Sequence, residues 1–175
     1  MVWLSLQPPH TSELLISHDS GTTFIRTSEP DLVSINGCSM NATSNSALWA
    51  ECPTGMAVSF FYSGNGGLSW NRVPNHQFSG TGGGYFDPVS NSLAYLDYGP
   101  NNSSNAKNLF QITKKGLEVR AVGRLPCESV DGLVFTDALH GLAACDTGST
   151  LPSIILERTT NGGVTWRRDS AFSSI

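Results

Sequence analysis

Six carboxylic acids are the residues whose type could support hydrolytic chemistry: Glu51, Asp87, Asp97, Glu128, Asp131 and Asp137. Hydrolysis of a glycosidic bond needs two carboxyl groups that face each other across a cleft, about 5–10 Å apart. The spacing along the chain pairs no two of the six, and Asp87 and Asp137 lie where aspartate more often closes a turn. The sequence therefore assigns a catalytic role to none of them, and the six are candidates by residue type alone.

Histidines and cysteines are the side chains that could hold a transition metal. The histidines show no ligand spacing; they are His10, His18, His76 and His140. The four cysteines form no Cys-x-x-Cys pair, the usual element of a zinc site. We therefore predict neither a metal site nor a cofactor.

A polar octet that recurs along the chain is its most regular feature. The pattern is Ser or Thr, any residue, Asp or Asn, any residue, Gly, any residue, Ser or Thr, and an aromatic residue. Copies begin at residues 17, 63 and 159, so the intervals are 46 and 96, the second being twice 48. A fourth copy in register, residues 112–119, keeps the glycine (Gly116) and loses the polar positions. Self-similarity at a period of about 47 residues indicates a repeat architecture.

Each defined position of the octet has a physical role in a tight turn. An Asp or Asn side chain accepts hydrogen bonds from the backbone N–H groups that follow it. Glycine adopts a positive φ without steric cost, and the aromatic residue anchors the next strand. The predicted structural residues are therefore Ser17, Asp19, Gly21, Phe24, Ser63, Asn65, Gly67, Trp70, Thr159, Asn161, Gly163 and Trp166. In the degenerate copy Lys114 cannot accept a bond, so Gly116 and strand pairing should hold that turn.

Short apolar or alternating runs around the octets predict four antiparallel strands per repeat, the composition of a propeller blade. The predicted strands are 2–6, 13–16, 22–27, 32–36, 47–52, 56–62, 68–73, 83–87, 92–97, 108–112, 117–122, 132–136, 141–145, 153–157 and 164–168. The fold class is thus all-β, a single domain with blades at about 1–28, 29–75, 76–124 and 125–175. The first blade lacks its earliest strand, which residues 172–175 could supply by closing a ring.

The four cysteines fall in pairs before the second and fourth octets. Their matching placement favours two disulfides within blades, Cys38–Cys52 and Cys127–Cys145, over four free buried thiols. Each bridge would stabilise the fold by about 3 kcal/mol. Disulfides imply an oxidising compartment, yet residues 1–9 do not resemble a signal peptide. A missing N-terminus would reconcile these observations with an extracellular, periplasmic or cell-surface location.

Charge and hydropathy exclude two classes of partner. The net charge is −4, and the ten Lys and Arg residues form no basic patch, which argues against nucleic acid. No apolar run approaches the ~20 residues of a membrane span. Three glycosylation sequons begin at Asn41, Asn101 and Asn102, but a chain so rich in Asn and Ser can contain them by chance.

The octets resemble the Asp-box, or BNR repeat, of sialidase-like β-propellers. Residues 132–143 followed by 158–166 are most similar to repeats of the photosystem II assembly-factor family and of exported bacterial propellers. The same blades occur in sortilin-type receptors and xyloglucan-degrading glycosidases, so the resemblance implies the fold more than the function. Sialidases also carry a Phe/Tyr-Arg-Ile-Pro motif, which Arg124-Leu125-Pro126 echoes only as a turn.

The resemblance implies a non-catalytic, exported binding or assembly module that uses a propeller face to bind a protein or a glycan. The alternative is a fragment of a sialidase-like or xyloglucanase-like glycoside hydrolase with an incomplete active site. Propellers of this kind usually have six to eight blades, so the chain is expected to form part of a propeller, or else a four-bladed one. Open blade edges could then mediate self-association.

Overall fold

The computed structural model describes residues 2–6, 13–28, 30, 38–54, 57–74, 84–99, 107–146 and 154–169. Within these ranges the chain contains β-strands and turns and no helix. Its strands form four antiparallel sheets, each built from segments that are consecutive in the chain. This confirms the predicted all-β fold class.

In each sheet, strands that are consecutive in the chain are neighbours, so chain order runs from one edge of the sheet to the other. The first sheet contains β1 (Val2–Leu6), β2 (Glu13–Ser17) and β3 (Ile25–Ser28). The second contains β4 (Ser39–Ala42), β5 (Leu48–Thr54), β6 (Ala57–Ser63) and β7 (Asn71–Arg72). The third contains β8 (Phe86–Ser90), β9 (Leu93–Tyr98), β10 (Lys107–Thr113) and β11 (Glu118–Leu125). The fourth contains β12 (Ser129–Phe135), β13 (Gly141–Asp146), β14 (Ile154–Thr159) and β15 (Arg167–Arg168).

The strand predicted at 32–36 falls on residues outside the described ranges, and β4 pairs with β5 in the place expected for it. Only Met40 of β4 is buried, so this polar edge strand carries little apolar signal in the sequence. Residues 172–175, which could have supplied a closing strand, also lie outside the described part.

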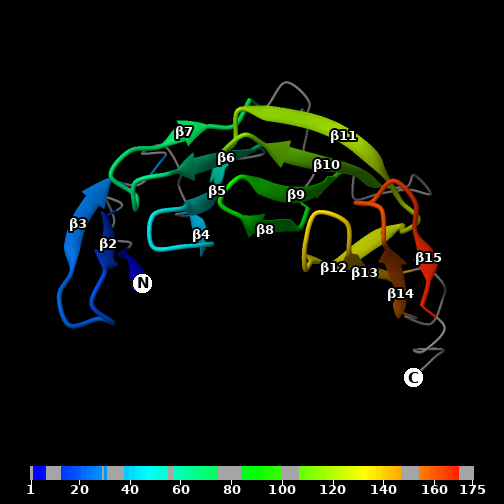
Figure 1. Ribbon diagram of the computed structural model, residues 1–175, viewed down its shortest axis with the longest axis horizontal. Coiled ribbons are helices and arrows are strands. Elements are labelled where there is room, and N and C mark those ends of the chain that lie inside the picture. The colour runs from blue at the N-terminus through cyan, green and yellow to red at the C-terminus, as the bar shows by residue number, and fades with distance from the viewer. Residues whose placement is uncertain are drawn as a thin grey trace.

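The four sheets follow an open arc, with the first and fourth sheets at its two ends (Figure 1). The strands β4, β8 and β12 lie on the concave inner side, and β3, β7, β11 and β15 lie on the outer side. This is the radial arrangement of propeller blades. The four sheets thus agree with the predicted propeller blades.

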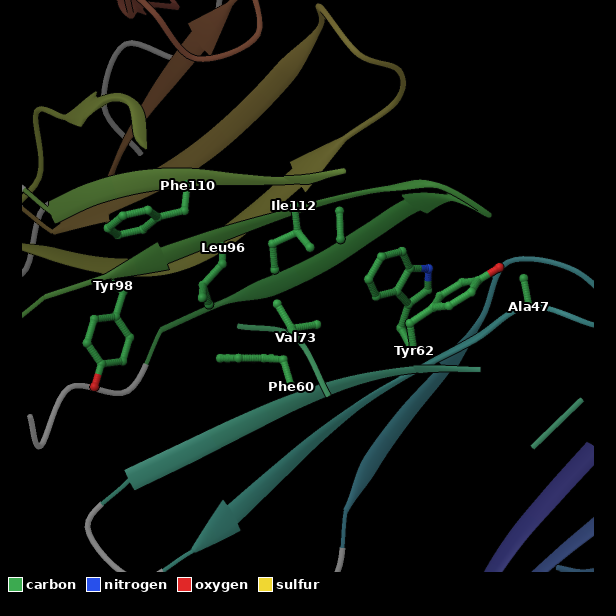
Figure 2. Close-up of a cluster of buried hydrophobic side chains, with 10 residues drawn as sticks. Ala47, Phe60, Tyr62, Val73, Leu96, Tyr98, Phe110 and Ile112 are labelled. Atoms are coloured by element: carbon green, nitrogen blue, oxygen red, sulfur yellow. The ribbon is translucent and has the colours of Figure 1, made fainter. Parts of the chain in front are cut away.

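Apolar packing between successive sheets holds the arc together. Figure 2 shows the cluster between the second and third sheets, in which Phe60, Tyr62 and Val73 meet Leu96 and Ile112. A second cluster joins the third and fourth sheets, and a third joins the first and second. Burial of apolar surface drives this stacking.

Alternate residues of a middle strand pack against two different neighbouring sheets. In β5, Leu48 and Ala50 pack in the cluster with Ile16 of the first sheet, whereas Trp49 packs against the third sheet. All three are at most 1% exposed. A strand buried on both faces has no polar face, which is why 47–52 reads as a nearly continuous apolar run.

Candidate binding surfaces

The three complete octets form turns with the same hydrogen bonds. In the second octet Ser63 Oγ accepts the N–H of Gly67 at 2.8 Å and donates to Asn65 Oδ1 at 2.9 Å. Asn65 Oδ1 also accepts the N–H of Ser69 at 2.9 Å. Equivalent bonds join the first, third, fifth and seventh residues of the octets that begin at Ser17 and Thr159. The side chains thus tie both sides of each turn to its backbone.

The first octet has a carboxylate where the other two have an amide. Asp19 accepts the backbone N–H of Thr23 at 2.8 Å and its hydroxyl at 2.6 Å. The Thr23 hydroxyl and N–H, followed by the Ser17 hydroxyl, lower the pKa of Asp19 to about 2. The carboxylate therefore stays charged and acts as an acceptor within the turn.

The degenerate octet forms a different turn, closed by its backbone. Lys114, Lys115 and Gly116 have φ values of 49°, 58° and 85°, and Gly116 N–H donates to the Thr113 carbonyl at 3.1 Å. Lys114 also forms an exposed ion pair with Glu118 at 2.6 Å. The turn is followed by strand pairing from Thr113 and Glu118 onward.

The octet glycines also contact the preceding sheet. Thr27 Oγ1 donates to the Gly67 carbonyl at 2.5 Å. A Cβ on Gly116 would lie 3.1 Å from Val73 Cγ2, and a Cβ on Gly123 would lie 2.1 Å from the Gly163 carbonyl oxygen. The three contacts between sheets join equivalent positions. The first residue of each contact lies on the outer strand of one sheet, opposite the third residue before that sheet's octet. The second residue is the fifth residue of the octet in the next sheet. The pairs are Thr27–Gly67, Val73–Gly116 and Gly123–Gly163.

Both proposed cysteine pairs form disulfides, Cys38–Cys52 and Cys127–Cys145. The described part of the chain has no free cysteine. Each bridge ties the chain at the inner edge of its sheet to the neighbouring strand, β5 or β13. Two disulfides are typical of proteins that fold in an oxidising environment.

Three of the six candidate carboxylates, Asp87, Asp97 and Asp137, accept backbone N–H groups within the fold. Asp87 accepts the N–H of Phe135 from the next sheet at 2.5 Å, and burial raises its pKa. Asp137 accepts the N–H groups of Leu139 and His140 at 2.7 and 2.9 Å and lies 2.8 Å from His140 Nδ1. These bonds lower the pKa of Asp137 to about 2.

Asp97 and Glu51 lie at equivalent positions of neighbouring sheets, each opposite the third residue before an octet. Asp97, only 1% exposed, accepts the N–H of Tyr85, and burial raises its pKa to about 6 despite the opposing charge of Lys107. Burial, and then the charge of Asp97, also raise the pKa of Glu51. Glu51 and Asp97 are thus the two candidates whose charges interact. Glu128 and Asp131 are exposed.

The described residues contain no group of three His, Cys, Asp or Glu side chains that could hold a metal ion. His18 lies beside Gly66 of the second octet, and His140 pairs with Asp137. His10 and His76 lie outside the described ranges. Within the part of the chain that the structure covers, no helix could span a membrane.

The concave side of the arc is one candidate binding surface, called here the inner-strand surface. It is bordered by β4, β8 and β12, each of which is the edge strand of its sheet (Figure 1). An edge strand leaves half of its backbone N–H and C=O groups unpaired. Exposed side chains on or beside these strands include polar Ser39, Asn41, Ser129 and Asp131, aromatic Tyr85 and apolar Val134.

A second candidate surface is the side of the fourth sheet that faces away from the third sheet. A pocket of about 260 Å³ opens there, and its lining is largely apolar. Val134 and Leu142, which are 49% and 38% exposed, form part of the lining together with Arg158 and Asp169. The sequence offered no sign of this pocket, because a strand pattern does not show which face of a sheet its neighbours leave uncovered.

No family model and no curated protein matches the chain. Among solved structures, "YCF48 bound to D1 peptide" matches 95% of this chain and 42% of that chain, with a TM-score of 0.55 and 13% identity. YCF48 from Cyanidioschyzon merolae matches 100% of this chain and 60% of that chain, with a TM-score of 0.61 and 13% identity. The Niastella koreensis GH74 enzyme matches 91% and 34% of the two chains, with a TM-score of 0.40 and 14% identity.

At this level of identity the two YCF48 structures show the fold alone. The predicted resemblance to assembly-factor-like propellers is thereby confirmed at the level of the fold. The chain spans only 42% and 60% of these two proteins. The Asp-box assignment of the octets and the blade boundaries stay predictions.

Proposed function

We propose that this chain is a non-catalytic, exported binding or assembly module whose inner-strand surface binds a segment of another protein. The observation that carries the proposal is the row of edge strands β4, β8 and β12 along the concave side. An extended peptide can pair with such an edge through its backbone, while exposed side chains select its sequence. A similar propeller fold, YCF48, is known in a form bound to a D1 peptide, which supports a peptide over a glycan.

The bonding of the carboxylates supports a binding role over hydrolysis. Asp87 and Asp137 accept backbone N–H groups. Asp97, whose charge acts on Glu51, is buried beneath the surface, where a substrate would not reach it. The competing proposal is a fragment of a glycoside hydrolase with an incomplete active site.

Selection from a phage-displayed library of random peptides tests the proposal. We expect enriched peptides whose binding weakens about tenfold or more in Tyr85→Ala and Asp131→Ala, since both residues are exposed on or beside inner strands. Leu117→Ala is the matched control, because Leu117 is 62% exposed on the outer hairpin.

Two outcomes would contradict the proposal. One is enrichment of peptides that bind all three variants equally, because the site would then lie elsewhere. The other is turnover of a fluorogenic sialoside or of xyloglucan that Glu51→Gln abolishes, because the chain would then be a glycosidase. A printed glycan array run in parallel distinguishes a glycan ligand from a peptide.

A further inference from the structure

Each sheet has one side that faces the next sheet along the chain, called here its forward face. Strand pairing identifies equivalent residues on these faces. Trp49 lies opposite Tyr62, Tyr95 opposite Gln111, and Leu142 opposite Arg158. The second residue of each pair comes directly before an octet. The outer-strand position on the same face is Thr27, Val73, Gly123 or Asp169 in the four sheets.

The forward faces of the second and third sheets are covered by the sheet that follows. Trp49 and Tyr95 are fully buried, and each donates a hydrogen bond to a carbonyl of the next sheet. Trp49 Nε1 donates to Ser90 at 3.0 Å, and Tyr95 Oη donates to Ala138 at 2.8 Å. Tyr95 also stacks on Phe135 of the fourth sheet, with ring centroids 3.6 Å apart.

The forward face of the fourth sheet has the same geometry, and no sheet among the described residues covers it. Leu142 stands where Trp49 and Tyr95 are buried, yet it is 38% exposed. The pocket of about 260 Å³ lies on this face, and Leu142, Arg158 and Asp169 all line it.

Among the described residues, the first octet does not make the contact that the later octets make with a preceding sheet. In the three later octets the fifth residue, Gly67, Gly116 or Gly163, contacts the sheet before it. A Cβ on Gly21, the fifth residue of the first octet, would meet no atom within 4 Å. The three interfaces join Thr27–Gly67, Val73–Gly116 and Gly123–Gly163, and the corresponding positions that these interfaces do not use are Asp169 of the fourth sheet and Gly21 of the first octet. These two residues lie in the sheets at opposite ends of the arc (Figure 1).

We propose that the forward face of the fourth sheet binds the first sheet of a second copy of this chain. The first octet of one copy would lie against Asp169 and Leu142 of the other, as the later octets lie against the preceding sheets. Such a contact joins two different surfaces, so it is head-to-tail. Two copies whose arcs meet at both ends form a closed ring, and copies that do not meet form an open array. Neither Tyr85 nor Asp131, the residues that test the inner-strand surface, lines this pocket.

Light scattering on the purified chain measures the association directly. We expect a mass of two copies, or one that grows with concentration. Leu142→Arg places a charge in the pocket and should weaken association about tenfold or more, whereas Leu117→Arg, on an exposed hairpin, should not. Unfolding temperatures of both variants establish that each is folded.

A mixing experiment tests whether the contact is head-to-tail. Ser20 corresponds to Gly162, where a Cβ would lie 3.3 Å from Tyr95 Oη of the preceding sheet, so Ser20→Arg should block the first octet. Ser20→Arg and Leu142→Arg should each be monomeric alone. Their mixture should form a one-to-one complex, because each variant keeps the surface that the other lacks. A monomeric wild-type chain, association that Leu142→Arg does not weaken, or a mixture that stays monomeric would overturn the proposal.

Discussion

Carboxylates in this chain serve the fold in two electrostatically opposite ways. Asp19 and Asp137 are exposed and accept several N–H or hydroxyl bonds, which favour the charged form and lower the pKa of each to about 2. Asp97 is buried, which disfavours the charged form and raises its pKa to about 6. The first kind stabilises the fold when ionised, and the second kind stabilises it when protonated.

The burial of Asp97 predicts that stability falls as the pH rises from about 4 to about 6. Because the folded-state pKa is raised above the ordinary 3.8, the folded state holds a proton that the unfolded state has lost in this window. One such group changes the free energy of unfolding by up to about 1.4 kcal/mol per pH unit. Glu51, whose pKa is also raised, adds to the same trend. Urea unfolding at several pH values above 4.5 avoids the opposite effect of Asp19 and Asp137.

Asp97→Asn removes the titrating group and can still accept the N–H of Tyr85. We expect this variant to show a flatter dependence of unfolding free energy on pH than the wild type. Asp131→Asn is the control, since Asp131 is exposed. An unchanged slope in Asp97→Asn would show that Asp97 does not retain the proton.

The octet side chains predict a second effect at the scale of single residues. Asn161 Oδ1 accepts the N–H of Thr165 at 3.0 Å, and Nδ2 donates to its hydroxyl at 2.9 Å. Asn161→Ala should lower the free energy of unfolding by about 1–2 kcal/mol. Asn161→Asp should cost much less, because Asp19 makes the corresponding bonds in the first octet. Equal losses in the two variants, measured by urea unfolding, would contradict this role of the acceptor.

At the scale of elements, the sequence predicted the middle strands better than the edges. Middle strands such as β5 and β9 are buried on both faces, so their apolar runs are easy to recognise. The predicted outer strands 68–73 and 164–168 shrink to Asn71–Arg72 and Arg167–Arg168, because the end of each octet still belongs to the turn. Contacts between sheets could not be predicted, since the rotation from one sheet to the next leaves no local pattern.

Gly123 shows how closely the sheets approach, and it carries the prediction at this scale. A Cβ there would lie 2.1 Å from the Gly163 carbonyl oxygen, a backbone atom of the next sheet. Gly123→Ala should therefore lower the free energy of unfolding by about 2–3 kcal/mol. Gly132→Ala is the matched control, because the nearest atom to its Cβ would be 3.8 Å away. Thermal unfolding of the two variants compares them, and equal stability would show that the interface can relax.

At the scale of the whole molecule, the stacked sheets resemble a short one-dimensional array. Each apolar cluster joins only two successive sheets, as in repeat proteins, whose stability is roughly a sum of unit and neighbour contributions. The two disulfides lie in the second and fourth sheets, so they reinforce alternate units. The fourth sheet lies at an end of the arc, where it has one neighbour in the chain (Figure 1).

This arrangement predicts that loss of the disulfide in the fourth sheet destabilises that sheet more than the others. Cys127→Ala with Cys145→Ala should lower stability by about 3 kcal/mol in the chain-entropy model. Hydrogen exchange should rise in β12 to β14, while β5 and β6 in the second sheet keep their protection. The matched control is Cys38→Ala with Cys52→Ala, whose loop of 14 residues resembles the loop of 18 in the fourth sheet. It should open the second sheet and, because that sheet has neighbours on both sides, should also weaken protection in them. Uniform loss of protection in both variants would mean that the four sheets unfold as one unit.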